Sequence, residues 1–595
     1  MSVIFKTGKL CLYRKPYNTT FCKYVFLRKA SDIPRAFISF DEVVAQRRAQ
    51  ARRSLVVQVN SESSFSELYG YCSKYATIND IHHYKNSGGE NFMLIEFSSE
   101  ENVKDVLQSC SSHQKDLDVM AVPSPFLWFR AASGKVKYPA CNRSLLVKDG
   151  IAKANEDELF DDLLSCNTVS DQIQLLYDRT MLNDLGIRLR YMVARQLEVI
   201  FSSLYANIAI QPFGSSVNGF GRMGCDLDLV LTNTLTAEMA TPNRRLVYQE
   251  KKSEGGRSPW QRHMELVAAM LELRAPGASR VQRILHARVP IVKYSHEMTD
   301  LDCDLCYNNT SGVYMSELLW ALGSLDARVR PLVCAVRRWA RAAGLTNAHP
   351  GRWVTNFPLT LMVLFFLQRA EGRVLPPLNT LIRLAGKEDI RIAEENLNCT
   401  FLRDMNKLPR DSYGQNDDSL ETLLIKFFEF YAQFDFQEKA ISVNEGAPVR
   451  KPNSLPLYIV NPLEQALNVS RNVSYEELER LRLEVRNAAW QLEAGLEGKK
   501  GQDWGILGLM EKRASRELKN LLRVGNSHRL VSVKDLFSDK EDDDEHQPQL
   551  KTDKSVGVNE TKDSIAKDDK VTRDVKFKNT QVRNEVNRIR RGKIV

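Results

Sequence analysis

Residues 212–229 read PFGSSVNGFGRMGCDLDL and combine a Gly-Ser pair with two alternating aspartates. Gly214 and Ser215 follow a short β-rich run, and Asp226 and Asp228 alternate with leucines at the start of a second one. Successive side chains of a strand point to opposite faces. We therefore expect both aspartates to project from one face of a strand, while the leucines enter a core.

This arrangement predicts chemistry on phosphate-bearing substrates. Two carboxylates on one strand face repel each other unless cations neutralise them. A pair of divalent metal ions about 3.5–4 Å apart is the usual solution in phosphoryl and nucleotidyl transfer. The glycine allows the backbone to approach a phosphate, and the serine hydroxyl beside helix-initial N–H groups forms a small anion cradle.

The pattern resembles the signature of the DNA polymerase beta-like nucleotidyltransferase superfamily. Members of that superfamily need a third carboxylate on a neighbouring strand, and residues 301–305 read LDCDL. By resemblance Asp304 fills this role, ahead of the paired Asn308 and Asn309, and Asp302 on the same strand face is the alternative. The simplest competing interpretation is three acids that are unrelated in space.

Within that superfamily, the following region is similar to the noncanonical poly(A) polymerases and terminal uridylyltransferases. Residues 325–341 read LDARVRPLVCAVRRWAR and match the central helix of those enzymes. Arg337 and Arg341 are four residues apart, hence on one helical face, and the resemblance implies that they contact the triphosphate. An ordinary exposed basic face is the alternative.

The same resemblance implies three further nucleotide contacts. Residues 355–362 read TNFPLTLM. There Phe357 corresponds to the ring that stacks on the incoming base, and Asn356 to a phosphate or sugar contact. Ser316 matches a hydroxyl position near the ribose. The competing interpretation of Phe357 is that it begins a buried helix.

A later segment bears on the choice of base. Residues 456–470 read PLYIVNPLEQALNVS and resemble the nucleotide-recognition loop of the family. Leu467 stands where uridylating relatives often have a histidine that narrows the base pocket, so the resemblance favours ATP over UTP. Asn461 replaces the acid that is usual at its position.

Residues 54–130 form a separate pattern of strand, helix, strand, strand, helix and strand. This order is typical of a ferredoxin-like α+β sandwich and resembles an RNA-recognition-motif (RRM) domain. Where such domains carry a Lys/Arg-Gly-aromatic run, residues 90–97 read ENFMLIEF. The domain is therefore an RNA reader or a module for packing or self-association, and the family resemblance implies a homodimer formed through it.

The net charge of +9 is concentrated at the N-terminus. Residues 1–53 carry 12 basic and 3 acidic residues, whereas the other 542 residues balance. Basic residues with interspersed Ser and Thr and no long apolar run are typical of an organellar transit peptide. We therefore expect a protein of the mitochondrial matrix. A disordered basic arm that contacts nucleic acid is the alternative.

The overall pattern predicts an α+β protein with a nucleotidyltransferase palm, a helical central domain and a charged, disordered tail. The eleven cysteines are scattered, which indicates a reducing compartment. No apolar run reaches the roughly 20 residues of a membrane-spanning helix, so no membrane association is expected. The predicted boundaries are 1–53 for the leader, 54–135 for the RRM-like domain, 136–169 for a linker, 170–320 for the palm, 321–530 for the helical domain and 531–595 for the tail.

These observations together predict an enzyme that adds AMP from ATP to the 3′ ends of mitochondrial RNA and releases pyrophosphate. Asp226, Asp228 and Asp304 are expected to hold two Mg²⁺ or Mn²⁺ ions. The order of leader, RRM-like domain, palm motifs and recognition loop is most similar to the mitochondrial branch of the poly(A) polymerases. Two alternatives stay open: a terminal uridylyltransferase or mixed-specificity transferase, and an inactive RNA-binding scaffold.

Overall fold

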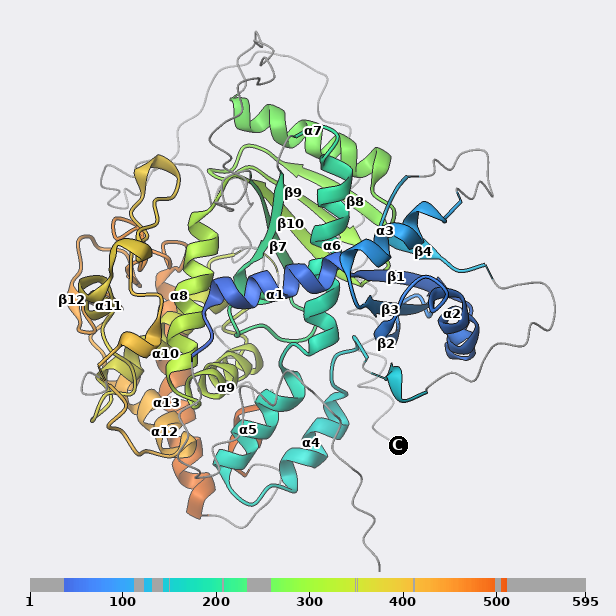
Figure 1. Ribbon diagram of the computed structural model, residues 1–595. Helices are drawn as coiled ribbons and strands as arrows, with labels where there is room; N and C mark the ends of the chain where they lie inside the picture. Colours follow the sequence, from blue (N-terminus) through green and yellow to red (C-terminus); the bar gives the residue numbers. More distant parts are fainter. Residues whose placement is uncertain are drawn as a thin grey trace, which may run out of the picture. The chain divides into compact units, whose positions relative to one another are not determined.

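The computed structural model describes most of the chain as one body that contains a small N-terminal domain, a mixed sheet and a helical region (Figure 1). The predicted tail, 531–595, lies outside the described residues, as does most of the predicted leader. The residues that the structure describes are 37–111, 122–130, 143–148, 150–205, 208–232, 258–347, 349, 351–409, 413–497 and 504–510.

Helix α1 (Phe40–Arg52) corrects the predicted leader, residues 1–53, because it is part of the folded body. Phe40 and Arg47 are buried, and the Arg47 guanidinium lies 2.7 Å from the carboxylate of Asp184. Figure 1 shows α1 lying across α6 and beside α8. Arg47 and Arg48 of this helix therefore pair with acids of the folded body, which differs from a leader that extends to residue 53.

The N-terminal domain has the predicted βαββαβ order. Its sheet has the strand order β4-β1-β3-β2-β5, in which a short additional strand, β5, pairs with β2. Helices α2 and α3 cover one face through an apolar core of their own. The elements are β1 (Ser54–Val59), α2 (Phe65–Cys72), β2 (Ile78–Lys85), β3 (Asn91–Phe97), α3 (Glu100–Gln108), β4 (Phe126–Trp128) and β5 (Leu146–Val147).

The other face of this sheet is buried against the palm. Val56, Tyr84, Phe92 and Leu94 share an apolar cluster with residues of helix α6 (Asp184–Phe201). The Tyr84 and Phe92 rings stack with centroids 5.3 Å apart, and the Tyr84 hydroxyl donates to a palm carbonyl at 3.0 Å. An RRM stacks RNA bases on this face. The structure therefore favours the packing alternative over the RNA reader.

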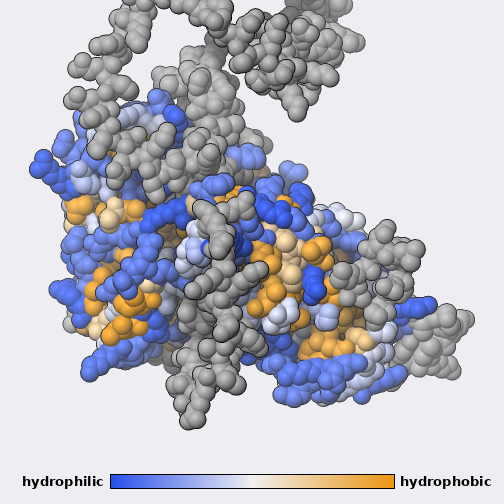
Figure 2. Space-filling view, turned by 90° about the horizontal axis from the view of Figure 1, so that it is seen from above, coloured by the Kyte–Doolittle hydropathy of each residue, from blue (hydrophilic) through white to orange (hydrophobic). Residues whose placement is uncertain are grey.

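The palm is built on a five-stranded sheet of order β6-β7-β10-β9-β8, with α6 and α7 packed on one face. The sequence pattern predicts four of its strands, at 208–213, 227–231, 289–294 and 301–306. It does not predict β8, because half-exposed polar residues give that strand no clear alternation. Figure 2 shows hydrophobic surface in separate patches on the face seen from above. The elements are β6 (Ala209–Phe213), β7 (Leu227–Thr232), α7 (Pro259–Arg274), β8 (Ala278–Ile284), β9 (Ile291–His296) and β10 (Leu301–Tyr307).

The helical region surrounds one large apolar core. No helix among the described residues is long and apolar enough to cross a membrane. The elements of the helical region are α4 (Glu156–Leu164), α5 (Val169–Thr180), α8 (Ser311–Leu325), α9 (Val329–Ala342), α10 (Asn356–Arg369), α11 (Leu378–Leu384), α12 (Leu420–Ala432), β11 (Lys439–Ala440), β12 (Val449–Arg450), α13 (Tyr475–Glu497) and α14 (Ile506–Met510).

Two predicted boundaries differ from the structure. The predicted linker, 136–169, contains α4, whose Leu159 and Leu163 enter the helical core. The spacing of apolar residues predicts a single helix from residue 170 to residue 204. The structure has two helices there, because the chain is extended at Met181 and the Asn183 side chain caps α6. Of these two helices, α5 belongs to the helical core and α6 packs on the palm sheet.

A buried ion network joins the N-terminal domain to the palm. Arg188 of α6 pairs with Asp184 at 2.7 Å, with Asp80 at 3.4 Å and with Glu96. Its side chain is 12% exposed, so water screens these interactions only weakly. Removing the cation would leave three carboxylates without their shared partner.

We predict that Arg188→Met lowers the free energy of unfolding by about 3–5 kcal/mol, because one partner of a buried ionic cluster is lost. The matched control is Arg283→Met, which breaks an exposed ion pair with Glu272. It should change the free energy of unfolding by less than about 1 kcal/mol. Thermal melting of the full chain measures both. Equal effects of the two substitutions would contradict a structural role for the network.

Candidate active site

Asp228 and Asp304 lie side by side on neighbouring parallel strands, β7 and β10. Asp226 comes two residues before Asp228 and therefore shares its face of the sheet. Leu227 and Leu229 are fully buried on the opposite face, as their alternation predicts. The structure therefore brings the three predicted carboxylates close enough together to interact electrostatically.

Asp302 also points to this face, but its surroundings differ from those of Asp304. The Asp302 side chain is 54% exposed, and it accepts a hydrogen bond from the Ser295 hydroxyl at 2.6 Å. The Asp304 side chain is 24% exposed and stands in register with Asp228. The geometry therefore favours Asp304 as the third carboxylate.

Burial and mutual repulsion raise the pKa values of two of these acids. Burial, together with the charges of Asp304 and Asp226, raises the pKa of Asp228 to about 7. Burial also raises the pKa of Asp226, and Lys293 opposes that shift. The site thus holds more negative charge than its own cations neutralise.

Lys293 of β9 is the cation nearest to these carboxylates and was not identified from the sequence. Its Nζ lies 3.0 Å from one carboxylate oxygen of Asp304 and donates to the other at 3.3 Å. A lysine in the β-branched run of residues 291–294, in register with an aspartate of the next strand, is the signal that could have revealed it.

Three carboxylates are suitable ligands for hard divalent cations, which prefer oxygen donors. Among the described residues, no three His, Cys, Asp or Glu side chains are already arranged as a ligand set. The Asp304 carboxylate turns to Lys293 instead, and the high pKa of Asp228 shows an unmet need for positive charge. The donor chemistry therefore fits Mg²⁺ or Mn²⁺, whose binding would draw the carboxylates together.

Gly214 lies directly against the Asp228 carboxylate. Its φ of +69° is in the left-handed region, and a Cβ atom there would lie 2.2 Å from Asp228 Oδ2. A side chain at this position would collide with the acid. Glycine is thus required by both the backbone conformation and the close approach.

Ser316, for which the resemblance implies a ribose contact, holds Gly214 in place in the structure. It is buried, its hydroxyl accepts a hydrogen bond from the Gly214 N–H at 2.7 Å, and it donates to the Gly312 carbonyl at 2.7 Å. A hydroxyl enclosed in this way positions the Gly-Ser turn and is not presented to a substrate.

Arg190 of α6 holds the same loop through hydrogen bonds, and this role was not predicted from the sequence. The buried guanidinium donates to the Ser216 hydroxyl at 3.1 Å and to the Cys225 carbonyl at 2.6 Å. Ser216 in turn donates to the Asp226 carbonyl at 3.2 Å. An arginine among the apolar residues Val193 and Leu197, on one helical face, is the signal that could have indicated this role.

The two arginines predicted to contact the triphosphate occupy different environments. Arg337 donates to the Phe220 carbonyl at 2.7 Å and to the Thr360 hydroxyl at 3.1 Å, and burial lowers its pKa to about 10. It therefore joins the Gly-Ser loop to α10 in place of the predicted phosphate contact. Arg341, one turn later, is exposed.

Asn356 and Phe357 form the first turn of α10. The Asn356 side chain is exposed, and the backbone carbonyl of Asn356 accepts a hydrogen bond from the Thr360 hydroxyl at 2.7 Å. The Phe357 ring is half-buried and packs against the helical core on one side. Phe357 thus stands at the start of α10, as the competing interpretation predicts, and part of its surface is not covered by the core.

The recognition loop is held in a defined turn. The Asn461 side-chain oxygen accepts hydrogen bonds from the N–H groups of Leu463 and Glu464 at 3.0 and 3.1 Å. Leu467 is half-buried, and its carbonyl accepts from the Asn461 N–H at 3.0 Å. The Glu464 carboxylate lies 2.8 Å from Arg288 of the palm. An ion pair therefore links this loop to the palm.

Three segments match known protein families. Residues 169–323 match the family described as poly(A) RNA polymerase, mitochondrial-like, central palm domain. Residues 419–463 match the Cid1 family poly A polymerase, and residues 39–111 match the RL domain. The last match begins at helix α1, which agrees with the folded character of that helix.

Whole-chain comparisons agree with these matches. The chain is 44% identical to the mitochondrial poly(A) RNA polymerase of Drosophila melanogaster over 84% of each chain. It is 34% identical to the Homo sapiens enzyme of that name, over 84% of this chain and 85% of the other. The crystal structure of mtPAP in complex with ATPgammaS superposes with a TM-score of 0.69 at 32% identity, covering 80% of this chain and all of that one. The chain thus belongs to the mitochondrial poly(A) RNA polymerase family and is a template-independent RNA adenylyltransferase.

Proposed function

We propose that this enzyme acts in the mitochondrial matrix and that Asp226, Asp228 and Asp304 hold two Mg²⁺ or Mn²⁺ ions during AMP transfer to RNA 3′ ends. The observation that carries this assignment is the register pairing of Asp228 with Asp304 beside Gly214. Such ions, when bound, supply the positive charge that the carboxylates and the triphosphate need and acidify the attacking 3′-hydroxyl.

The chain's own residues position the other reactants. Gly214 and Ser215 present the backbone and a hydroxyl to the phosphates, and exposed Arg341 supplies a guanidinium for the triphosphate. Arg190 and Ser316 keep the loop rigid through the hydrogen bonds described above. The RNA 3′-hydroxyl attacks the α-phosphate in line, and pyrophosphate leaves from the side of the Gly-Ser turn.

The base is proposed to stack on Phe357, while Asn356 contacts the sugar or a phosphate. Crystal structures of mtPAP contain ATPgammaS, GTP, UTP or CTP. The nucleotide site of mtPAP therefore accepts all four bases. We therefore propose that this enzyme selects ATP by how well the bound nucleotide is positioned for reaction. Leu467 leaves room for a purine base there. Selectivity of this kind is expressed in kcat/KM.

We predict that Asp228→Asn and Asp304→Asn each reduce RNA extension by at least about 10³-fold, because charge neutralisation dominates this chemistry. Extension of an RNA primer with ATP and Mg²⁺ is the measurement. The matched control is Asp302→Asn, on the same face but more exposed, which should retain most activity. Loss of activity in Asp302→Asn with retention in Asp304→Asn would reverse the assignment.

A second prediction concerns the base. Leu467→His should narrow the pocket and lower kcat/KM for ATP relative to UTP by about tenfold. Each of the four nucleotides is supplied separately with the same primer, and Leu463→His in the same turn serves as the control. Preferential UMP addition by the wild type would instead establish the uridylyltransferase alternative.

We further propose that the enzyme forms a homodimer through its RRM-like domain. One face of the domain's sheet is buried against the palm and the other is covered by α2 and α3, so the edge strands β4 and β5 and the helices remain for association. Trp128, at the end of β4, is 48% exposed.

Sedimentation equilibrium of the full chain tests this assembly. The expected species has twice the 67.9 kDa of one chain. Trp128→Glu should shift the equilibrium toward the monomer, whereas Trp490→Glu, at an exposed residue of α13, should leave it unchanged. A monomeric wild type would refute the dimer.

A further inference from the structure

Lys293 of β9, Asp304 of β10 and Asp228 of β7 form one row across a face of the palm sheet. Lys293 stands in register with Asp304, and Asp304 stands in register with Asp228. Adjacent strands lie about 4.7–4.9 Å apart, so each residue of the row is held beside the next. The row thus places an ammonium group next to a carboxylate for which a divalent ion is proposed.

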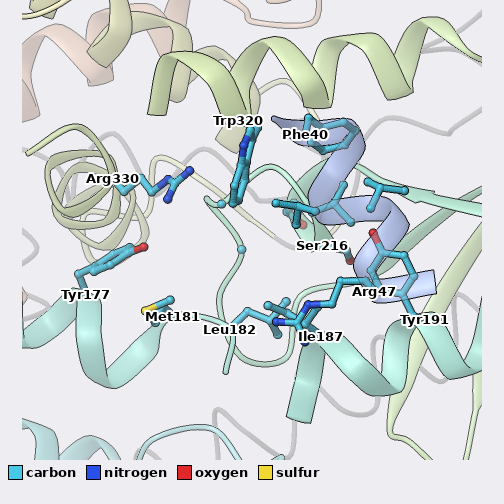
Figure 3. A pocket seen from close by; sticks show the side chains of 16 residues that line it. Phe40, Arg47, Tyr177, Met181, Leu182, Ile187, Tyr191, Ser216, Trp320 and Arg330 are labelled. Atoms are coloured by element: carbon cyan, nitrogen blue, oxygen red, sulfur yellow. The ribbon is translucent and has the colours of Figure 1, made fainter. Parts of the chain in front are cut away.

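This row lies on an open face of the sheet and not in an enclosed cavity. The cavity of about 70 Å³ behind the Gly-Ser loop is lined by residues such as Phe40, Trp320 and Arg330 (Figure 3). Its described lining includes neither Lys293 nor any of the three carboxylates. The Lys293 side chain is 37% exposed, and its four-carbon stem is flexible. The ammonium group can therefore move toward solvent without disturbing the core.

The contact between Lys293 and Asp304 is looser than a comparable ion pair elsewhere in the chain. The Lys293 Nζ lies 3.0 Å from Asp304 Oδ1 and donates to Oδ2 at 3.3 Å. Lys426, with a similar exposure of 42%, donates to both oxygens of Asp418, at 3.0 and 2.8 Å. Charge-assisted hydrogen bonds are about 2.7–2.9 Å long. Lys293 thus neutralises Asp304 without being tightly bonded to it.

A divalent ion and Lys293 compete for the same carboxylate. Mg²⁺ binds about 2.0–2.1 Å from its oxygen ligands. An ion on either oxygen of Asp304 would therefore lie within about 5.5 Å of the ammonium nitrogen in its present position. Two cations this close repel each other. Pairing of Lys293 with Asp304 therefore opposes metal binding there.

We propose that Lys293 is a displaceable counter-ion, which neutralises Asp304 until a divalent ion binds and then swings away from that carboxylate. This inference rests on the metal site proposed above. Two acceptors lie within the same region of the sheet: Asp302, 54% exposed on the same strand face, and exposed Gln282 of β8, in register with Lys293. Lys293 thereby sets the concentration of divalent ion that the enzyme requires.

Titration of Mn²⁺ into the full chain, without nucleotide or RNA, tests this role. Electron paramagnetic resonance measures the free ion and hence the Kd. If Lys293 holds Asp304 in about nine of ten molecules, the measured Kd is about tenfold higher than that of the competent fraction. Lys293→Met, which keeps the unbranched stem and removes the charge, should therefore lower the Kd about tenfold.

Two further substitutions at this position set the direction of the effect. Lys293→Arg should raise the Kd, because a guanidinium pairs with a carboxylate through two hydrogen bonds and is harder to displace. Lys293→Gln is a second neutral variant, which should lower the Kd as Lys293→Met does and replaces it if Lys293→Met does not fold. Thermal melting in EDTA establishes that each variant is folded.

The matched control is Lys426→Met, which removes an ion pair of similar exposure far from the carboxylate row in the sequence. It should bind Mn²⁺ like the wild type. An unchanged Kd in the neutral Lys293 variants would refute the displacement. A higher Kd in these variants would also refute it, and would show instead that Lys293 orients Asp304 for the ion.

The same titration separates this inference from the metal-site assignment. Asp228→Asn should abolish saturable Mn²⁺ binding in the wild type and in Lys293→Met. Binding that persists in Asp228→Asn would refute the assignment and the displacement together. Binding that requires Asp228 but is the same with and without the Lys293 charge would refute the displacement alone. None of these measurements depends on catalysis.

Discussion

The crowding of three carboxylates on one face of the palm sheet is the constraint on which the surrounding structure depends. Asp228 lies between Asp304 in register and the backbone of Gly214, and its burial, together with the charges of Asp304 and Asp226, raises its pKa to about 7. The pairing of β7 with β10 keeps the backbones of Asp228 and Asp304 close, because adjacent strands lie about 4.7–4.9 Å apart. Side-chain rotation alone can move their carboxylates apart, as the pairing of Asp304 with Lys293 shows.

Near the three carboxylates, side chains of three helices hold the Gly-Ser loop in place. Ser316 fixes it from α8, Arg190 from α6 and Arg337 from α9, each through hydrogen bonds to or beside the loop. None of the three requires a substrate for these contacts. Their common effect is preorganisation, which reduces the rearrangement needed when charge develops in the reaction.

The alternation of residues in single strands is sufficient to predict the carboxylate face, because a period of two is a local property. Asp226 and Asp228 can therefore be placed on one face from the alternation, whereas Asp304 joins them only through the family resemblance and the pairing of β7 with β10. The sequence assigns Ser316 and Arg337 to the substrate because a polar side chain near a motif looks the same whether it contacts a ligand or a distant backbone group. Their partners, Gly214 and Phe220, are more than 100 residues away in the chain. Helix α1 resembles leader sequence for the same reason, since its basic residues find their acids only in the folded body.

The burial of the RRM-like sheet has a consequence for work with fragments of this enzyme. Each large apolar side chain on that face, among them Phe92 and Leu94, contributes roughly 1.5–3 kcal/mol by leaving water, and the palm supplies the other half of the contact. A fragment limited to residues 54–130 would expose this face and tend to aggregate. Any nucleic-acid affinity measured on it would report a sticky surface that the intact enzyme never presents.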